Sequence, residues 1–269
     1  MAVVDAVVKL GGDVLAPPAL AAVAGDIARA RAAGRRLVIV HGGGPQATDL
    51  GRRLGIEPRL VGGRRITDAP TLDVVKMAVA GLVNVDLCAA LRAAGVPAVG
   101  VAGSSGVIRA HRRPPRVVSG SDGAAIDFGL VGDVEGFDRA LLDALDAAGT
   151  LPVVACLGGG AAGEVLNINA DVVASQLAGA IGAAALVACT AVGGVRRDKD
   201  DPATRLARLT VAEARAAIAD GTVQGGMIPK LEEAFAPLAA GVGAVHVVAP
   251  GEIAASLAAP GTAGTLLVA

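Results

Sequence analysis

The chain has 269 residues, of which 53% are hydrophobic and only 1% aromatic, and its formal net charge is −1. This length is enough for one large domain or for two closely joined halves. The near-neutral charge and the scarcity of aromatic side chains argue against nucleic-acid binding, which uses basic surfaces and aromatic platforms that stack on bases.

Nothing in the sequence indicates export or a membrane anchor. Asp5 and Lys9 interrupt the apolar N-terminal segment, and no uninterrupted apolar run reaches the roughly 18 residues of a spanning helix. The three cysteines, Cys88, Cys156 and Cys189, lie in apolar surroundings without metal-ligand spacing, which suits a reducing compartment. We therefore expect a cytoplasmic protein that contacts neither a membrane nor nucleic acid.

Short β-branched runs alternate with longer alanine-rich segments along the chain. The predicted strands are residues 3–10, 37–40, 98–101, 152–157, 185–189 and 245–248, which are apolar on both faces. The predicted helices are residues 18–33, 45–54, 69–94, 137–148, 170–181, 211–219 and 229–240. This alternation is typical of an α/β fold in which helices cover a mainly parallel sheet.

Residues 107–134 break this alternation. Short extended pieces are separated there by turn-forming residues, which predicts a β-hairpin insertion at one side of the sheet. A soft boundary near residue 150 divides the chain into an N-terminal half, 1–150, and a C-terminal half, 151–269. We expect the two halves to share one continuous sheet.

Two glycine-rich turns follow predicted strands. Gly11-Gly12 comes just after Lys9 at the end of the first strand, and Gly42-Gly43-Gly44 follows the second strand. The backbone N–H groups of such turns, together with a following helix N-terminus, can bind an anion at the carboxyl edge of a sheet. The turns therefore predict a phosphate site, although two simple tight turns would look the same.

Lys9 and Lys230 each lie at the edge of an apolar element beside a glycine cluster. Two lysines that converge on glycine loops suit phosphoryl transfer, in which catalysis is mainly charge stabilisation and alignment. Either lysine alone would indicate a solvated edge residue. No Walker-type loop is present, but the relaxed dinucleotide pattern at residues 42–47, with Asp68 downstream, leaves a hydride-transfer enzyme as a weaker alternative.

Polar residues also cluster at 166–171, just before an alanine-rich predicted helix. Asn169 or Asp171 is expected to cap that helix. The pair Arg64-Arg65 offers a fork for a carboxylate, whereas the basic cluster at 109–116 is most simply a solvated hairpin. None of the three histidines has metal-ligand spacing, so no protein-held metal is predicted.

Taken in order, these motifs resemble the amino acid kinase superfamily and, within it, the N-acetylglutamate kinase family. The motifs are Lys9-Leu-Gly-Gly, His41-Gly-Gly-Gly-Pro-Gln, Gly63-Arg-Arg-Ile-Thr-Asp, Gly81-Leu-Val-Asn, Gly129-Leu-Val-Gly-Asp, Asn167-Ile-Asn-Ala-Asp and Gly226-Met-Ile-Pro-Lys. They span nearly the whole chain and are specific as a set.

The resemblance implies a three-layer αβα sandwich of the carbamate kinase-like kind, with a mainly parallel sheet of about eight strands. The N-terminal half would bind the acylated amino acid and the C-terminal half would bind ATP with Mg²⁺. The implied reaction moves the γ-phosphoryl group of ATP to the side-chain carboxylate of N-acetyl-L-glutamate, a step of arginine biosynthesis. No covalent enzyme intermediate is expected.

The resemblance also implies roles for individual residues. Lys9 and Lys230 would stabilise the transferring phosphoryl group, and Asp171 would orient both lysines. The residues implied for substrate binding are Gly43, Gly44, Arg65 and Asn167, the last two for the α-carboxylate. The residues implied for ATP and phosphate binding are Gly11, Gly12, Thr190, Gly194, Gly226 and Met227.

The sequence departs from the family pattern at two loops. Ala191 stands where the nucleotide half usually has an Asp, which would leave Asp171 as the main carboxylate at the reaction centre. The loop 102–106 also lacks its usual acid. Because the chain starts close to its first strand, without the extra helix of arginine-inhibited hexamers, we expect an arginine-insensitive homodimer formed through helix 69–94.

Two alternative functions stay open. One is a related kinase that acts on 2-aminoadipate or glutamate linked to a carrier protein, for which the basic residues 109–116 would form a docking patch. The other is a non-catalytic amino-acid-sensing domain, which Ala191 would permit. The presence of Lys9, Lys230 and Asp171 favours catalysis over sensing, and the glycine motif that begins at His41 favours a free substrate.

Overall fold

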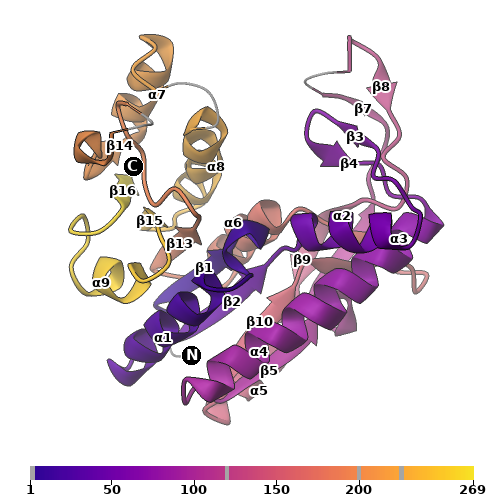
Figure 1. Ribbon diagram of the computed structural model, residues 1–269, viewed down its shortest axis with the longest axis horizontal. Coiled ribbons are helices and arrows are strands. Elements are labelled where there is room, and N and C mark those ends of the chain that lie inside the picture. Colours follow the sequence, from indigo (N-terminus) through magenta and orange to yellow (C-terminus); the bar gives the residue numbers. More distant parts are fainter. Residues whose placement is uncertain (1–3, 119–120, 199–200, 224–226) are drawn as a thin grey trace.

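The computed structural model describes residues 4–118, 121–198, 201–223 and 227–269. Its centre is an eight-stranded sheet with the strand order β14-β16-β15-β13-β1-β2-β10-β5 (Figure 1). The strands are β1 (Ala6–Leu10), β2 (Leu37–His41), β5 (Ala98–Ala102), β10 (Leu151–Ala155), β13 (Ala185–Cys189), β14 (Arg208–Thr210), β15 (Ala244–Val248) and β16 (Thr265–Val268). All neighbouring pairs are parallel except β15 with β16. The prediction of a mainly parallel sheet is confirmed.

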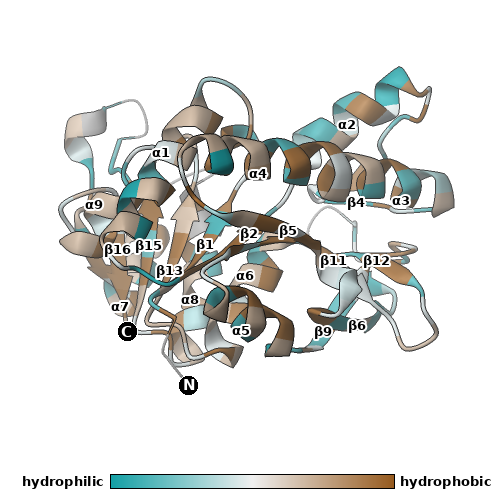
Figure 2. Ribbon diagram, turned by 90° about the horizontal axis from the view of Figure 1, so that it is seen from below, coloured by the Kyte–Doolittle hydropathy of each residue, from teal (hydrophilic) through white to brown (hydrophobic). Residues whose placement is uncertain are grey.

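Helices cover both faces of this sheet, so the predicted three-layer sandwich is also confirmed (Figure 2). One layer contains α1 (Ala19–Ala32), α4 (Asn84–Ala93) and α9 (Ile253–Ala258). The opposite layer contains α5 (Ala140–Ala147), α6 (Ala170–Ala180), α7 (Val211–Ala219) and α8 (Met227–Ala239). The short helix α9 and the strands β14 and β16 were not predicted from the sequence.

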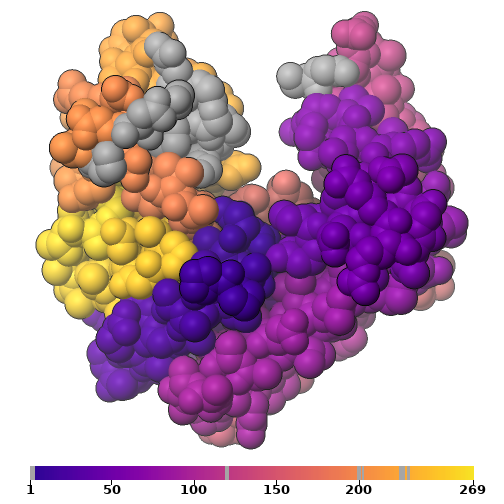
Figure 3. Space-filling view, viewed as in Figure 1, coloured from indigo at the N-terminus to yellow at the C-terminus, as the bar shows by residue number. Residues whose placement is uncertain are grey.

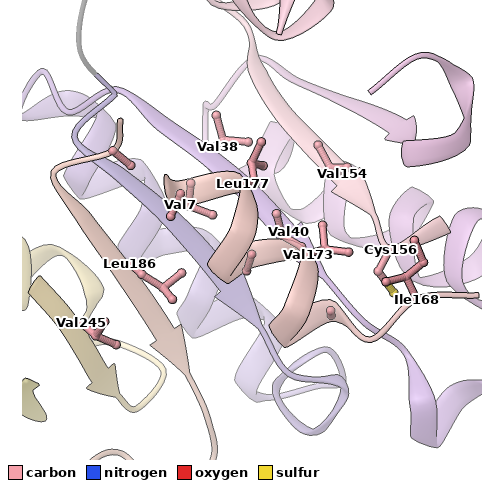
Figure 4. Packing of buried hydrophobic residues seen from close by; sticks show 14 of the residues in the cluster. Val7, Val38, Val40, Val154, Cys156, Ile168, Val173, Leu177, Leu186 and Val245 are labelled. Atoms are coloured by element: carbon pink, nitrogen blue, oxygen red, sulfur yellow. The ribbon is translucent and has the colours of Figure 1, made fainter. Parts of the chain in front are cut away.

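The core is aliphatic on both sides of the sheet because successive strand residues point to opposite faces. In β1, Val7 belongs to the cluster that contains Leu177 of α6 (Figure 4), whereas Val8 belongs to the cluster that contains Ile27 of α1. Each such side chain is fully buried, and its removal from water contributes about 1.5–3 kcal/mol to the stability of the folded state. Strands that are buried on both faces explain the near-continuous apolar runs in the sequence.

The predicted hairpin insertion supplies two strands, β6 and β9, of a second, four-stranded sheet with the order β12-β11-β6-β9, and the other two strands come from later in the chain. The strands of this sheet are β6 (Ile108–Arg112), β9 (Gly132–Phe137), β11 (Leu157–Gly159) and β12 (Val165–Asn167). Two small hairpins extend beyond it, β3–β4 (Leu60–Val61 with Arg64–Arg65) and β7–β8 (Arg116–Val117 with Ala125–Ile126). The single strand expected at 152–157 divides at Cys156, because β11 leaves the main sheet and joins the insertion.

The predicted helix 69–94 is continuous but irregular. It consists of α3 (Ala69–Val75), a π-helical stretch (Lys76–Val83) and α4. Among the described residues one helix, Ala69–Ala93, is long and apolar enough to cross a membrane by length and composition alone, and 44% of its most apolar window is buried inside the molecule. Residues of this helix belong to both hydrophobic clusters, as expected of a helix that packs on a core.

Candidate active site

A cavity of about 560 Å³ opens at the carboxyl ends of β1 and β2. It lies between the C-terminal part of the chain and the hairpins of the N-terminal half, where the space-filling view shows an open notch (Figure 3). Its lining includes Lys9, Gly11, Gly12, Gly43, Gly44, Arg65, Asn167 and Asp171. The structure therefore brings together these residues predicted for the substrate and for the transferred phosphoryl group, whereas the side chain of Lys230 lies outside the described part.

A second cavity of about 290 Å³ adjoins the first on the side of the C-terminal half. Thr190 and Asp13 line it, together with apolar residues of β13 and β15. Lys9, Asp171 and Glu233 line both cavities, and the first two, Lys9 and Asp171, are in direct contact there. These two residues thus mark the point at which molecules bound in the two cavities would meet.

Lys9 and Asp171 form a close ion pair at this junction. The distance between Lys9 Nζ and Asp171 Oδ1 is 2.6 Å, and the side chains are 12% and 26% exposed. Asp171 lies in the first turn of α6, and its N–H donates to Asn169 Oδ1 at 2.7 Å. Asn169 is therefore the helix cap, and the helix dipole favours a carboxylate at Asp171.

The two glycine turns are held against each other at the same edge. Gln46 Nε2 of helix α2 (Gly44–Arg53) donates to the carbonyl oxygen of Gly12 at 2.8 Å. A Cβ atom on Gly12 would lie 2.6 Å from Cδ of Pro45, so only glycine fits there. Because both α2 and α6 begin at the larger cavity, two helix N-termini present their free N–H groups to it.

Arg65 and Asn167 both line this cavity, and Thr67 contacts both of them. Arg65 Nη2 donates to the carbonyl oxygen of Gly44 at 3.1 Å and to Oγ1 of Thr48 at 2.7 Å. Burial lowers the pKa of Arg65 from its ordinary value of 12.5, which leaves the guanidinium charged at neutral pH. Asn167 Nδ2 donates to Thr67 Oγ1 at 3.1 Å. Within the described part of the chain no carboxylate pairs with Arg65, so its charge is available to an anion.

The basic cluster at 109–116 is not simply a solvated hairpin: that interpretation was wrong for Arg113, whereas Arg116 is exposed on the small hairpin β7–β8. Both residues line the larger cavity. The Arg113 side chain is only 6% exposed and forms an ion pair with Asp133 at 2.7 Å. Burial, and then repulsion from Arg113, lowers the pKa of Arg116. In contrast, the Arg112 side chain is exposed and pairs with Asp127.

Asp13 is a site residue that the sequence analysis missed. Its Oδ2 atom accepts a hydrogen bond from the N–H of Ala191 at 2.9 Å. Its Oδ1 atom lies so close to Gly11 that a Cβ atom added to Gly11 would be 2.2 Å from it. Asp13 thus brings a second carboxylate, besides Asp171, to the smaller cavity and to the loop that contains Ala191. The sequence feature that could have identified Asp13 is its position immediately after Gly11-Gly12. Beside it, Oγ1 of Thr190 is buried and has no hydrogen-bond partner among the described residues.

The remaining predicted residues lie elsewhere or outside the described residues. Gly194 does not line either cavity in the described structure; it has a φ of 117° in a turn that packs on Thr265. Gly226 lies outside the described residues. Met227 and Lys230 belong to the first turn of α8, but their side chains are outside the described part.

No cluster of three or more His, Cys, Asp or Glu residues among those described could hold a metal ion. This does not conflict with Mg²⁺, which usually binds through one or two carboxylates together with nucleotide phosphates and water. Asp13 and Asp171 supply carboxylates of that kind at the smaller cavity. Cys156 also lines the larger cavity, but burial raises the pKa of its thiol to about 12, so it is no nucleophile at neutral pH.

Comparison with known proteins agrees with this arrangement. The model of the amino acid kinase family matches residues 6–249. An acetylglutamate kinase of Sorangium cellulosum is 54% identical over 97% of this chain and 94% of its own length. The crystal structure of N-acetylglutamate synthase from Neisseria gonorrhoeae, complexed with coenzyme A and N-acetyl-glutamate, superposes with a TM-score of 0.81 at 26% identity, over 98% of this chain and 59% of that one.

A carbamate kinase of Giardia has the same fold, with a TM-score of 0.71 at 17% identity over 100% of this chain and 99% of its own. The predicted carbamate kinase-like fold is therefore confirmed. Together, the family match and the high identity over nearly the full length show that the chain belongs to the acetylglutamate kinases of the amino acid kinase family.

Proposed function

We propose that this enzyme transfers the γ-phosphoryl group of ATP to the side-chain carboxylate of N-acetyl-L-glutamate in arginine biosynthesis. The observation that carries the proposal is the Lys9–Asp171 ion pair, which lies where the two cavities meet. The larger cavity takes the acyl amino acid, and the smaller one takes the nucleotide phosphates. The two substrates then approach each other across Lys9.

The larger cavity suits a substrate with two carboxylates. Its cationic lining is divided between Lys9 at the inner end and Arg65 with Arg116 at the hairpin end. The α-carboxylate binds Arg65 and the Asn167 amide, which directs the side-chain carboxylate toward Lys9. Because the substrate is attached at two fixed points, its attacking oxygen is already aligned with the γ-phosphorus before the reaction begins.

In the chemical step a side-chain carboxylate oxygen attacks the γ-phosphorus, and the bond between that phosphorus and the bridging oxygen of ADP breaks. No proton has to move, because the nucleophile is already an anion. Lys9, Lys230 and the N–H groups of Gly43 and Gly44 stabilise charge on the transferring phosphoryl oxygens. Asp13 or Asp171 would be the protein ligand of a Mg²⁺ ion that binds with ATP, and the ion would supply neutralisation of phosphate charge.

We further propose a homodimer formed through the long helix, in the cytoplasm. Leu82 and Val85 are large apolar residues that this helix exposes, and Val99 is exposed on the adjacent edge strand β5. Several large apolar side chains exposed on neighbouring elements are typical of a surface that a second copy covers. The cysteines, which are free thiols in the structure, suit a reducing compartment.

The deciding experiment is a coupled assay of ADP release with N-acetyl-L-glutamate, N-acetyl-2-aminoadipate and a carrier-linked substrate. We expect turnover with N-acetyl-L-glutamate at the highest kcat/KM. Preference for the carrier-linked substrate would favour the related carrier-dependent kinase. Turnover with none of the three would overturn the kinase reaction and favour a sensing domain. In the same assay, Lys230→Ala should lower kcat far more than it raises KM.

A further inference from the structure

A buried histidine and a buried asparagine lie directly behind the glycine turn at residues 42–44. His41 is the last residue of β2 and is completely buried, and Asn84 is the first residue of α4 and is 5% exposed. Asn84 Nδ2 lies 2.8 Å from His41 Nε2, and His41 Nδ1 lies 2.8 Å from the carbonyl oxygen of Gly42. These contacts form a continuous chain from the long helix to the turn that lines the larger cavity.

Only one arrangement of protons satisfies both contacts of His41. The carbonyl oxygen of Gly42 can only accept, so Nδ1 of His41 carries the proton and donates it. Asn84 Nδ2 also donates to the carbonyl oxygen of Val153 at 3.1 Å, which fixes the orientation of the amide. Nε2 of His41 is therefore the acceptor. Burial lowers the pKa of His41 to about 4, so the ring is neutral at physiological pH.

This contact orients a peptide group of the glycine turn. The carbonyl of Gly42 and the N–H of Gly43 belong to one planar trans peptide and point in opposite directions. A carbonyl that is held by His41 therefore directs the Gly43 N–H away from the histidine. Among the described residues no hydrogen bond uses this N–H, and Gly43 lines the larger cavity. The donor is left for an anion.

The long helix fits closely around the same turn. A Cβ atom on Gly43 would lie 3.1 Å from Cγ2 of Val79 and 3.3 Å from Cγ2 of Val83. On the other side, a Cβ atom on Gly100 of β5 would lie 1.7 Å from Oδ1 of Asn84, so a glycine is needed there. The π-helical stretch ends immediately before Asn84. Local π-helical segments occur frequently at functional sites, because they shift side chains from the regular helical register.

A purely structural role does not account for this polar chemistry. If His41 and Asn84 only filled the core, two apolar side chains of similar shape could replace their mutual contact, because exchanging both partners of a buried hydrogen bond can be nearly neutral. The polar pair adds a directed hydrogen bond to one carbonyl of the turn. That bond is what an apolar pair could not supply.

We infer that His41 and Asn84 are positioning residues for phosphoryl transfer, which hold the Gly42–Gly43 peptide so that its N–H faces the transferring phosphoryl group. Neither side chain touches the substrate; both act through the turn. The inference rests on the proposed function, since it assigns the N–H of Gly43 to that reaction.

The tautomer of His41 is the first test. With ¹⁵N-labelled histidine, the ring nitrogens of the three histidines can be observed by NMR at pH 7, and His41→Asn identifies the signals of His41. We expect a neutral ring with the proton on Nδ1. A ring with its proton on Nε2, or a charged ring, would overturn the inference. This measurement needs no turnover, so it stays valid even where the proposed substrate is wrong.

A matched pair of variants is the second test. The amide nitrogen of His41→Asn occupies roughly the place of Nδ1 and can still donate to Gly42, whereas that of His41→Gln occupies the place of Nε2 and cannot. We expect His41→Gln to lower kcat about 10- to 100-fold, with KM for N-acetyl-L-glutamate changed less than about threefold. His41→Asn should retain kcat within about fivefold of the wild type.

Thermal unfolding of both variants shows whether a loss of kcat comes from a misplaced glycine turn or from a loss of folded protein. Equal losses of kcat in the two variants, or losses that follow the loss of folded protein, would contradict a positioning role. The control His246→Gln changes another buried histidine, on β15, and should leave kcat unaltered. Asn84→Ser, which removes only the outer contact, should give a smaller loss of kcat than His41→Gln. A wild-type protein without turnover would overturn the proposed function instead.

Discussion

Nζ of Lys9 lies 2.6 Å from Oδ1 of Asp171, at the junction of the two cavities. The ammonium group of Lys9 has three N–H donors, and the contact with Asp171 uses one of them. The two others are then fixed in direction and available to phosphoryl oxygens on either side. Because both side chains are largely buried, solvent screens their interaction only weakly. In the proposed mechanism Asp171 orients Lys9 without taking part in bond making.

Asp171→Asn keeps the shape of this side chain and removes its charge. We expect kcat to fall about 100-fold or more, with KM for both substrates within about threefold, because the alignment of Lys9 matters most in the transition state. Steady-state kinetics test this. Asp49→Asn, which changes an exposed carboxylate paired with Arg53, is the control. An unaltered kcat in Asp171→Asn would remove Asp171 from the mechanism.

Arg65→Lys tests the attachment of the substrate α-carboxylate. The guanidinium of Arg65 is already held by Gly44 and Thr48, and a lysine cannot make both contacts and a forked interaction with a carboxylate. We expect KM for N-acetyl-L-glutamate to rise about tenfold or more, while KM for ATP stays the same. Arg53→Lys on the exposed side of α2 controls for loss of an arginine. A rise in KM for ATP alone would place Arg65 on the nucleotide instead.

Asp13 should affect the binding of ATP and not the binding of the acyl amino acid. Asp13→Ala removes the acceptor of the Ala191 N–H and releases the loop beside Thr190, so we expect KM for ATP to rise about tenfold. Asp13→Asn retains an acceptor oxygen, so it should raise KM for ATP less than Asp13→Ala does. Equal effects of the two changes would mean that the charge of Asp13, as a Mg²⁺ ligand for example, is what matters. No effect of either would show that the loop does not depend on Asp13.

Val85→Asp tests the proposed dimer. The Val85 side chain is 62% exposed in the middle of the apolar face of the long helix, and a buried, unpaired carboxylate at an interface is strongly unfavourable. We expect light scattering to give a dimer mass for the wild type and a monomer mass for the variant at micromolar concentration. Leu54→Asp, an equally exposed apolar position at the end of α2, should remain dimeric. A monomeric or hexameric wild type would contradict the proposal.

The elements that could be predicted from the sequence are those that a local pattern specifies. The strand at 185–189 and the helix at 211–219 have the same bounds in the structure as in the prediction. Thr265–Val268, in contrast, was missed, because it is four residues long and its identity as a strand depends on antiparallel pairing with β15. Such pairing is a tertiary effect that no local periodicity reports.

The candidate site follows the same division. Lys9 and the glycine turns were predicted because residue type and spacing already indicate anion chemistry, whereas the role of Asp171 was implied only by the resemblance to the family. Asp13 was missed because its partner is a backbone N–H 178 residues further along the chain, and any residue type can supply that donor. Arg113 was misassigned because its burial depends on Asp133, which a different strand brings beside it. The sequence shows the residue types, but it does not show which distant residues become partners in the fold.

The two buried histidines make stability depend on pH. Burial lowers the pKa of both His41 and His246 from 6.5 to about 4. Between these values the unfolded chain binds protons that the folded chain does not, so the unfolded state is favoured as the pH falls. Stability should therefore be constant above about pH 7 and should decrease below pH 6.5. Each histidine would account for about 2 kcal/mol of that decrease by pH 5, which is still above the ordinary pKa of carboxylates.

Urea unfolding at pH 7, 6 and 5 measures this decrease directly. His246→Leu removes one of the two titrating rings at a site whose Nδ1 atom has no partner among the described residues, so it should roughly halve the decrease in free energy of unfolding. A decrease of the same size in His246→Leu as in the wild type would show that other groups cause it. Because His246 lies in β15 and lines neither cavity in the described structure, the variant should retain kcat, which separates this effect from the chemistry of the site.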